Sequence, residues 1–431
     1  LAQFGQDHQE LETHLADKTP EWAAAITGIP ADRIIAFAHE YGRTEKAYIR
    51  VGYGFSRSRN GSQQLHAVTC LPTVTGKWPT KGGGAFYNNR EVYSSTIDET
   101  LIQGLDVADK SIRMLDMSRI GPVLTGEDPA LADGPPVTAM LVQNTNPALI
   151  APDIGQVHAG FKRDDLFLCV HEQFMTDTAK FADIVLPATM FLEHDDIYSS
   201  GGHGHFHFAP KAIDGPEGCV SNHDLLCQLA KRLGASHRGF DMTALEIIDE
   251  TLITSGLGGI AAIEEARWID LQADFETSHF MNGFPTDNGR FKFKVDWAAH
   301  GPYHAGLSAL PDYSPKDIDA ASAEHPFRLV VPPARNYLNS SFTETPTSIK
   351  REAKPVVKMH PDVARAKGID DGDLVTLGNQ LGSVGVHAEI FADLQPEVLI
   401  VEGVWPNAAF PGGLGINVLI SAAPSRPASG G

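Results

Sequence analysis

An apolar segment that runs into a polar turn, followed at once by a second apolar segment, constrains the fold of this chain most. The first segment, Leu166 to Val170, predicts a strand, and the polar residues Glu172, Thr176 and Thr178 follow it. The second segment, 184–186, predicts another short strand. Open parallel sheets bind nucleotides beyond the carboxyl ends of their strands. A carboxylate and two hydroxyls at that position therefore predict contacts to a base and its ribose or phosphate.

Helical and strand-like segments alternate over residues 1–300. Pro20 and Pro30 are typical of first helical positions, and strands are predicted at 47–51 and 138–142. Ser221 is typical of a helix N-cap, because its hydroxyl accepts a bond from the first turn. This alternation predicts the α/β class, with a mostly parallel sheet covered by helices.

The composition of the sequence changes after residue 300. Residues 301–324 are rich in Pro, Asp, Ser and Ala, which predicts a linker. Short strands are then predicted at 328–331, 374–377, 383–390 and 398–401. Frequent short strands are typical of a barrel. We therefore expect an α/β domain over 1–300 and a compact β-barrel domain over 325–431.

The charge balance limits the partners of this chain. It has 34 basic and 54 acidic residues and a formal charge of −20. Nucleic acid and anionic membranes select basic surfaces, so we expect neither as a partner. A small anionic ligand remains compatible, since backbone amides and a few cations outweigh a distant acidic surface. No segment has the length and apolar content of a membrane span.

A glycine-containing turn follows the strand predicted at 47–51. Gly52 and Gly54 would let the backbone approach a phosphate, and Phe55 and Arg57 follow them, with Arg57 placed to pair with the phosphate. A tight turn between a strand and a helix explains the same glycines equally well. The pattern alone therefore leaves both interpretations open.

Two further polar clusters stand out. Asn144 and Asn146 follow the strand predicted at 138–142, where such side chains more often satisfy a turn than hold a ligand. His203, His205 and His207 would share one face if extended, which is a possible zinc arrangement. The Ser and Gly residues before them favour a polar loop instead, so we predict no metal ligand.

Several of these segments, in this order, resemble the molybdopterin oxidoreductase family of formate dehydrogenases, nitrate reductases and dimethyl sulfoxide or biotin sulfoxide reductases. Residues 176–187 resemble its "T-x-T-A-x-x-A-D-x-V-L-P" signature, and 143–147 its "x-x-N-P" segment. Residues 335–342 resemble its "N-S-S/T-F" loop, and 415–419 its "x-V-N-x-L" segment. The resemblance spans about Pro20 to Leu419.

Two departures from the family pattern qualify the resemblance. Residues 75–84 resemble the loop "T-G-x-x-G-x-P-G-G-G", but Pro79 and Lys81 replace its middle Gly and its Pro. Residues 85–89 stand where formate dehydrogenases carry Arg-Gly-Gln-Asn-Asn, which argues against a formate dehydrogenase proper.

The resemblance implies a set of cofactor contacts. Glu172 stands where the family carries an Asp that accepts the N1 and N2 protons of guanine. The implied cofactor-binding residues are Gly52, Gly54, Phe55, Arg57, Gly76, Gly83, Asn144, Asn146, Pro147, Glu172, Thr176, Thr178, Arg335, Asn339, Ser340, Ser341 and Asn417. No catalytic residue and no metal ligand can be matched.

The resemblance also implies the cofactor and the architecture. The cofactor would be a bis(molybdopterin guanine dinucleotide) with molybdenum or tungsten. The α/β domain would hold one arm, and a C-terminal double-psi β-barrel would close over the pterins. The reaction would be oxygen-atom or hydride-equivalent transfer coupled to two-electron transfer, in which the cofactor does the chemistry.

We expect the sequence to lack the N-terminal part of such an enzyme, because it begins at Leu1 inside a predicted helix. A [4Fe-4S] cluster is expected only in that missing part. The expected partners are a small-molecule substrate, the missing segment or a partner chain, and an electron-transfer subunit. Taken alone, the chain is predicted to be inactive. Two alternatives remain: a stand-alone molybdopterin-binding subunit, and a non-redox hydratase or transhydroxylase of the same family.

Overall fold

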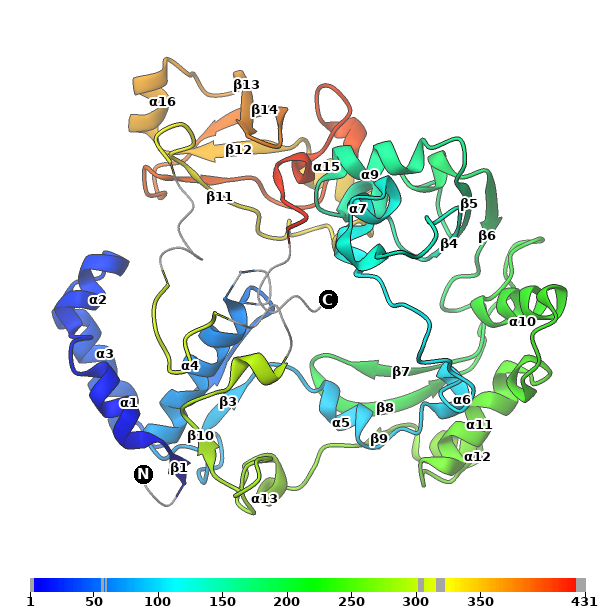
Figure 1. Cartoon of the computed structure of the whole chain (residues 1–431), viewed down its shortest axis with the longest axis horizontal. Helices are drawn as coiled ribbons and strands as arrows, with labels where there is room; N and C mark the ends of the chain where they lie inside the picture. The colour runs from blue at the N-terminus through cyan, green and yellow to red at the C-terminus, as the bar shows by residue number, and fades with distance from the viewer. Residues whose placement is uncertain (1–3, 56–57, 59, 301–305, 315–321, 424–431) are drawn as a thin grey trace.

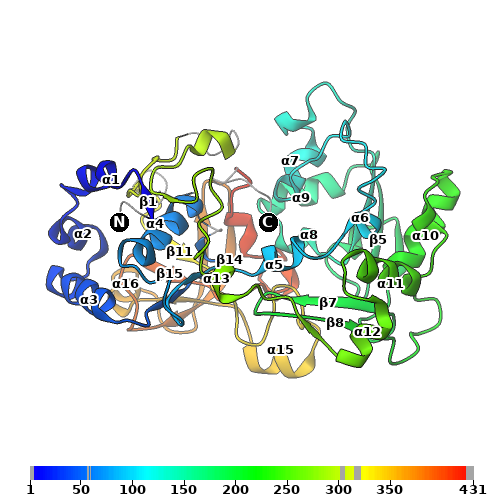
Figure 2. The ribbon, with the colours of Figure 1, turned by 90° about the horizontal axis from the view of Figure 1, so that it is seen from below.

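The computed structural model describes residues 4–55, 58, 60–300, 306–314 and 322–423. Arg57 and parts of the predicted linker lie outside these residues. The elements form four groups, which we call the N-terminal lobe, the sheet lobe, the antiparallel lobe and the C-terminal domain (Figure 1). The N-terminal helices and the helices of the antiparallel lobe lie at opposite ends of the molecule in both views (Figure 2).

The N-terminal lobe is built round a strand–helix–strand unit, in which β2 and β3 pair in parallel and α4 connects them. Helix α2 begins as expected, since the Thr19 hydroxyl accepts a bond from Trp22 N at 3.2 Å and Pro20 follows. The elements of this lobe are β1 (Gly5–Gln6), α1 (His8–Leu15), α2 (Pro20–Thr27), α3 (Ala31–Arg43), β2 (Tyr48–Arg50), α4 (Gly61–Val74), β3 (Gly84–Phe86), α13 (Phe275–Ser278) and β10 (Phe291–Lys292).

The sheet lobe contains the strands that the sequence marks most clearly. The strands are parallel in the order β4–β5–β6, with Val142 opposite Val170 and Val170 opposite Val185. Val170 is fully buried and Leu168 is 1% exposed, so the face of β5 that these two side chains share is packed in the core. The elements are α7 (Ile120–Thr125), β4 (Ala139–Gln143), α8 (Pro147–Ile150), α9 (Ile154–Phe161), β5 (Phe167–Glu172) and β6 (Ile184–Pro187).

The antiparallel lobe corrects one expectation. The segment with three histidines is not a loop: it forms β8, and Gly201 and Gly202 lie in the turn that joins β7 to β8. Glycines favoured the loop interpretation, but they are equally suited to a hairpin turn. The elements are α5 (Arg90–Ser94), α6 (Thr100–Gln103), β7 (Asp196–Ser200), β8 (His203–Ala209), α10 (Asn222–Leu233), α11 (Ala244–Thr254), α12 (Gly259–Ala266) and β9 (Ile269–Asp270).

The C-terminal domain is a curled five-stranded sheet in the order β11–β15–β12–β14–β13. Its core includes Val386 and Val401, which are fully buried. Strand β12 is absent from the sequence prediction, whereas the other four strands are confirmed. The elements are β11 (Arg328–Val330), α15 (Pro346–Glu352), β12 (Val356–Met359), α16 (Pro361–Lys367), β13 (Leu374–Asn379), β14 (Gly382–Ile390) and β15 (Val398–Ile400).

The architecture is therefore a mixed α/β fold with parallel sheets followed by a curled C-terminal sheet. Before the C-terminal domain, the parallel strands that the structure describes belong to three sheets, β1–β10, β2–β3 and β4–β5–β6, and not to a single one. Within the described residues, no helix is both long enough and apolar enough to cross a membrane.

Candidate functional site

The carboxyl edge of β4 and β5 carries two polar turns that are bonded to each other. The Oδ1 atom of Asn146 accepts from Thr178 N at 3.0 Å and from Thr178 Oγ1 at 2.8 Å. Thr178 Oγ1 in turn accepts from Ala148 N at 3.0 Å. Asn146 is 5% exposed and Thr178 is fully buried. These two buried side chains thus hold the two turns in a fixed position relative to each other.

Three neighbouring residues complete the turns. Asn144 has a φ of 49°, a left-handed conformation that Asn tolerates better than most residues, and its N–H donates to His171 O at 3.1 Å. Pro147 occupies the first position of α8. Thr176 Oγ1 accepts from Ala179 N at 3.2 Å. The backbone of this edge is therefore held in place by its own side chains.

Glu172 lies at the end of β5 and is half-buried. Its Oε1 atom accepts from Gln173 N at 2.7 Å. Burial raises the pKa of Glu172 above its usual range, the bond from Gln173 N lowers it, the carboxylate of Glu344 raises it, and His171 lowers it. The carboxylate is thus partly desolvated with no cation paired to it among the described residues. A ligand with two adjacent N–H donors would relieve that desolvation.

A loop of the C-terminal domain that precedes α15 carries four of the predicted site residues. Leu338 and Ser341 exchange two backbone bonds of 3.2 and 2.9 Å, and Asn339 and Phe342 have φ values of 51° and 67°. The carboxylate of Glu344, which follows this loop, raises the pKa of Glu172, so the two acidic groups influence each other. On this loop Arg335, Asn339 and Ser341 are exposed, and Ser340 is half-buried.

Two asparagines of the C-terminal domain cap the end of α8. Asn407 Nδ2 donates to Ala148 O at 2.9 Å, and Asn417 Nδ2 donates to Ile150 O at 2.8 Å. Asn407 Oδ1 also accepts from Gly415 N at 2.8 Å. Carbonyls at the end of a helix have no intrahelical partner, and these amides bond to them. Ala148 O also lies 2.8 Å from His158 Nε2, so Asn407 shares this carbonyl with the histidine. Asn417, predicted to contact the cofactor, thus also ties the two domains together.

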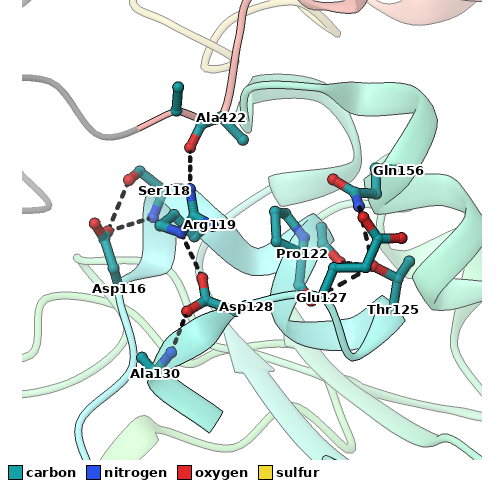
Figure 3. A network of polar contacts seen from close by, with 12 residues as sticks. Asp116, Ser118, Arg119, Pro122, Thr125, Glu127, Asp128, Ala130, Gln156 and Ala422 are labelled. Atoms are coloured by element: carbon teal, nitrogen blue, oxygen red, sulfur yellow. Dashed lines mark hydrogen bonds and ion pairs between the residues drawn. The ribbon is translucent and has the colours of Figure 1, made fainter. Parts of the chain in front are cut away.

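An arginine reinforces this junction (Figure 3). Arg119 Nε pairs with the carboxylate of Asp128, and its Nη1 donates to Ala422 O at 2.7 Å. Asp128 is only 6% exposed, so the pair is largely shielded from water. Near it, Gln156 Nε2 donates to Thr125 Oγ1 at 3.1 Å and to Glu127 Oε2 at 2.9 Å. The C-terminal segment is thereby fastened to the sheet lobe.

The remaining predicted residues lie in the N-terminal lobe, apart from this edge (Figure 1). Gly52 and Gly54 are exposed after β2, and Phe55 is half-buried. Gly76 ends α4 with a φ of 66°. Gly83 has no room for a side chain, because a Cβ would lie 2.3 Å from Lys77 O. The structure therefore does not join this group to Glu172.

The side chain of Lys77 holds part of the glycine-rich loop, residues 75–84, in place. Its ammonium, on a residue that is 5% exposed, donates to Gly42 O at 2.9 Å and to Thr44 O at 2.6 Å. These carbonyls lie at the C-terminal end of α3, where a cation is favoured by the helix dipole. Lys77 therefore stabilises the lobe and positions the loop.

The sequence interpretation missed Arg119, Asn407 and Glu344. Arg119 and Glu344 carry no local signal, since each acts on a segment distant in sequence. Asn407 had a weak one, because it interrupts an apolar segment. The three histidines of β8 do point to one face, yet no group of three His, Cys, Asp or Glu side chains among the described residues is arranged to hold a metal ion.

Comparison with known families gives two matches. Residues 7–232 match the family described as molybdopterin oxidoreductase. Residues 327–431 match the molydopterin dinucleotide binding domain.

Similar curated proteins include a probable oxidoreductase, YoaE, of Bacillus subtilis, with 31% identity over 94% of this chain and 58% of the relative. Dimethyl sulfoxide reductase DmsA of Escherichia coli is 27% identical over 96% of this chain and 55% of the relative. The F420-dependent formate dehydrogenase subunit alpha of Methanocaldococcus jannaschii is 24% identical over 91% and 58%, respectively. The chain thus spans little more than half the length of these relatives.

Among solved structures, acetylene hydratase from Pelobacter acetylenicus superposes with a TM-score of 0.74 at 16% identity, over 97% of this chain and 63% of that one. At this identity the likeness concerns the fold alone.

Proposed function

Since the chain belongs to the molybdopterin oxidoreductase family, we propose that it is the cofactor-binding C-terminal portion of an enzyme that carries a bis(molybdopterin guanine dinucleotide). Molybdenum or tungsten would be the metal. The observation that carries this proposal is the half-buried carboxylate of Glu172 at the carboxyl edge of a parallel sheet, in a chain whose residues 327–431 match the dinucleotide-binding domain.

The residues at this edge fit a guanine dinucleotide. Glu172 accepts only one described bond at Oε1, so its carboxylate can take the N1–H and N2–H donors of guanine. Asn144 lies beside it and offers an amide. Asn146 and Thr178 bind each other, and Thr176 and Pro147 shape the turns, so these four would position the site more than contact the base.

The loop of the C-terminal domain supplies groups suited to a pterin. A planar pterin carries many hydrogen-bond donors and acceptors. Matching groups are offered by Arg335, Asn339, Ser340 and Ser341. Asn417 fixes the loop's domain against α8. The exposed glycines of the N-terminal lobe, Gly52 and Gly54 with Phe55, and the loop at Gly76 and Gly83 would hold the second arm.

When bound, the cofactor would supply oxygen-atom or hydride-equivalent transfer with two electrons passed onward. The residues of this chain would bind it, orient it and exclude water. We assign no catalytic residue. The metal's protein ligand and the cysteines of a [4Fe-4S] cluster would come from polypeptide outside these 431 residues, either a preceding segment or a partner chain, and an electron-transfer subunit would accept the electrons. The chain alone would then not turn over.

The domain boundaries are part of the same proposal. Residues 1–300 would form the α/β part, 301–324 the linker, and 325–431 a double-psi β-barrel. The curl of the sheet, and the pairing of β12 in parallel with β14 and antiparallel to β15, support a barrel of mixed pairing.

A second candidate keeps the cofactor but not the net redox reaction. The fold likeness to an acetylene hydratase favours considering a hydratase or transhydroxylase. A stand-alone cofactor-binding subunit completed by a partner chain is the third candidate. Dye-linked electron transfer separates the first two, because hydration moves no net electrons.

The test is to purify the protein from a host that makes the cofactor, and to measure its metal and the GMP released by acid. Wild type should release GMP together with molybdenum or tungsten, and Glu172→Ala should release less. Glu12→Ala, an exposed carboxylate on α1, is the matched control and should be unchanged. Absence of metal and GMP from wild type would contradict the proposal.

A further inference from the structure

A cavity of about 430 Å³ lies where the N-terminal lobe meets the antiparallel lobe, away from Glu172. Strands β2 and β3 form one wall, with Tyr48, Arg50 and Phe86. The turn before β8 and the end of α13 form the other wall, with His203 and His279. No acidic residue lines it, although the chain carries 54 of them. The cavity is therefore suited to an anion.

Arg50 is held so that part of its guanidinium stays available. Its Nη1 donates to Tyr87 O at 2.7 Å and also to Val51 O. The guanidinium carbon lies 4.9 Å from the centre of the Phe86 ring, which is a cation–π distance. Both described bonds use Nη1, so Nε and Nη2 remain for a ligand. Adjacent nitrogens of one guanidinium bind a carboxylate in a fork.

The two histidines differ in which ring nitrogen carries the proton. His203 Nδ1 lies 3.1 Å from His205 N, which can only donate, so Nδ1 accepts and Nε2 bears the hydrogen. His279 Nδ1 lies 2.6 Å from Trp78 O, which can only accept, so Nδ1 bears the hydrogen. His203 therefore has an N–H donor left for a ligand, and His279 has a free Nε2.

Aromatic side chains bound the same cavity and are fixed in position. Trp78 Nε1 donates to Thr73 Oγ1 at 3.0 Å, and its ring meets Phe280 edge-on at 5.1 Å. Asn89, which is 4% exposed, donates to Ser200 O at 2.7 Å and also to His203 O, and so holds the two walls together. Partial burial raises the pKa of Tyr48, and the charge of Arg50 lowers it, so these two side chains are close.

We propose that this cavity binds a small aromatic carboxylate, with the carboxylate on Arg50 and His203 and the ring between Trp78, Phe86 and Tyr48. A carboxylate matches the guanidinium fork and the imidazole N–H. A flat ring matches walls made of aromatic faces and edges. The site is apart from Glu172, and it shares Gly83 with the loop that we assign to the second arm of the cofactor.

Isothermal titration of the whole protein with benzoate tests the proposal, with benzamide as the uncharged ligand of the same shape. Wild type should bind benzoate and not benzamide. Arg50→Gln should weaken benzoate binding by about 10-fold or more, as expected for loss of a charge-assisted bond. Arg50→Lys keeps the charge but not the fork and should fall between the two. Arg365→Gln, an exposed arginine on α16, should bind as wild type does.

Circular dichroism checks that each variant is folded. If Arg50→Gln does not fold, the comparison of benzoate with benzamide on wild type still decides. The proposal is overturned if wild type fails to bind benzoate in the millimolar range or binds both ligands equally. It is also overturned if folded Arg50→Gln binds benzoate as wild type does.

Discussion

The junction between the sheet lobe and the C-terminal domain satisfies its polar groups closely, whereas the N-terminal lobe leaves many groups uncovered. At the junction, Asn407, Asn417 and Arg119 each bond to backbone carbonyls of the other domain. In the N-terminal lobe, α2 and α3 have no buried residue, and Phe37 is 65% exposed. Both amide atoms of Gln63, which is 2% exposed, have no hydrogen-bond partner among the described residues.

The difference indicates which part of the chain is complete in itself. Buried polar groups in folded proteins nearly always have partners, and large exposed apolar surfaces mark interfaces. At the junction the buried amides have partners. In the N-terminal lobe, Gln63 has none among the described residues, and α2 and α3 have no buried residue. The carboxyl edge with Glu172 should therefore be stable within this chain, while the N-terminal lobe fits the proposal that a further segment or a partner chain covers it.

The largest effect on stability is expected at Arg119. Arg119→Ala leaves the carboxylate of Asp128, which is 6% exposed, without its cation. Loss of one partner of a buried pair costs about 3–5 kcal/mol in the free energy of unfolding. Denaturant unfolding measures it. Arg365→Ala removes an exposed arginine and should change the free energy far less. Equal effects would show that the junction is no better packed than the surface.

A smaller loss is expected at Asn407. Asn407→Ala removes the donor to Ala148 O and the acceptor of Gly415 N, both buried. Such a change costs about 1–3 kcal/mol. Hydrogen exchange by mass spectrometry should show faster exchange in α8 and in residues 415–420. Unchanged exchange at both places would mean that these bonds do not hold the domains together.

Little effect on stability is expected at Phe37. Because its side chain is 65% exposed, Phe37→Ser should change the free energy of unfolding of the isolated chain by less than about 0.5 kcal/mol. A loss of several times that amount would show that the apolar face of α3 is covered, and would remove the contrast between the two regions. Thermal unfolding of both proteins side by side provides the measurement.

The smallest effect is a pH dependence from Glu172. Burial raises the pKa of this carboxyl above 4.5 in the folded chain, so the folded state binds more protons than the unfolded state just above that pH. Glu172 therefore lowers stability as the pH rises through this window. Without cofactor, Glu172→Gln should be slightly more stable than wild type at pH 7, with a smaller difference at pH 4. A larger difference at pH 4 would reverse the sign and refute the desolvation argument.

Local signals predicted much of the fold. The helix starts predicted at Pro20 and after Ser221 are confirmed. The strands at 138–142, 166–170 and 184–186 are confirmed to within two residues. Strand β12 was missed because Lys358 divides its apolar residues, so Val356–Met359 gives no continuous apolar segment.

The site was predictable only as a set of residue types. The motif residues of 143–147 and 172–178 lie at the carboxyl edge of β4 and β5, whereas those of the N-terminal lobe lie apart from it. Their roles depend on contacts between distant segments. Asn146 bonds to Thr178, 32 positions away, and Asn407 to Ala148, 259 positions away. The spacing of these residues along the sequence does not show whether their amide groups bond to the protein or to a ligand.

The most direct test of the central claim, that Glu172 recognises guanine at this edge, compares the binding of GMP and IMP by isothermal titration. IMP lacks the 2-amino donor, so wild type should bind GMP more tightly by about 10-fold, the value of one hydrogen bond to a charged group. In Glu172→Ala the two nucleotides should bind alike. Equal binding of GMP and IMP by wild type, or a preference for GMP that survives in Glu172→Ala, would contradict the account.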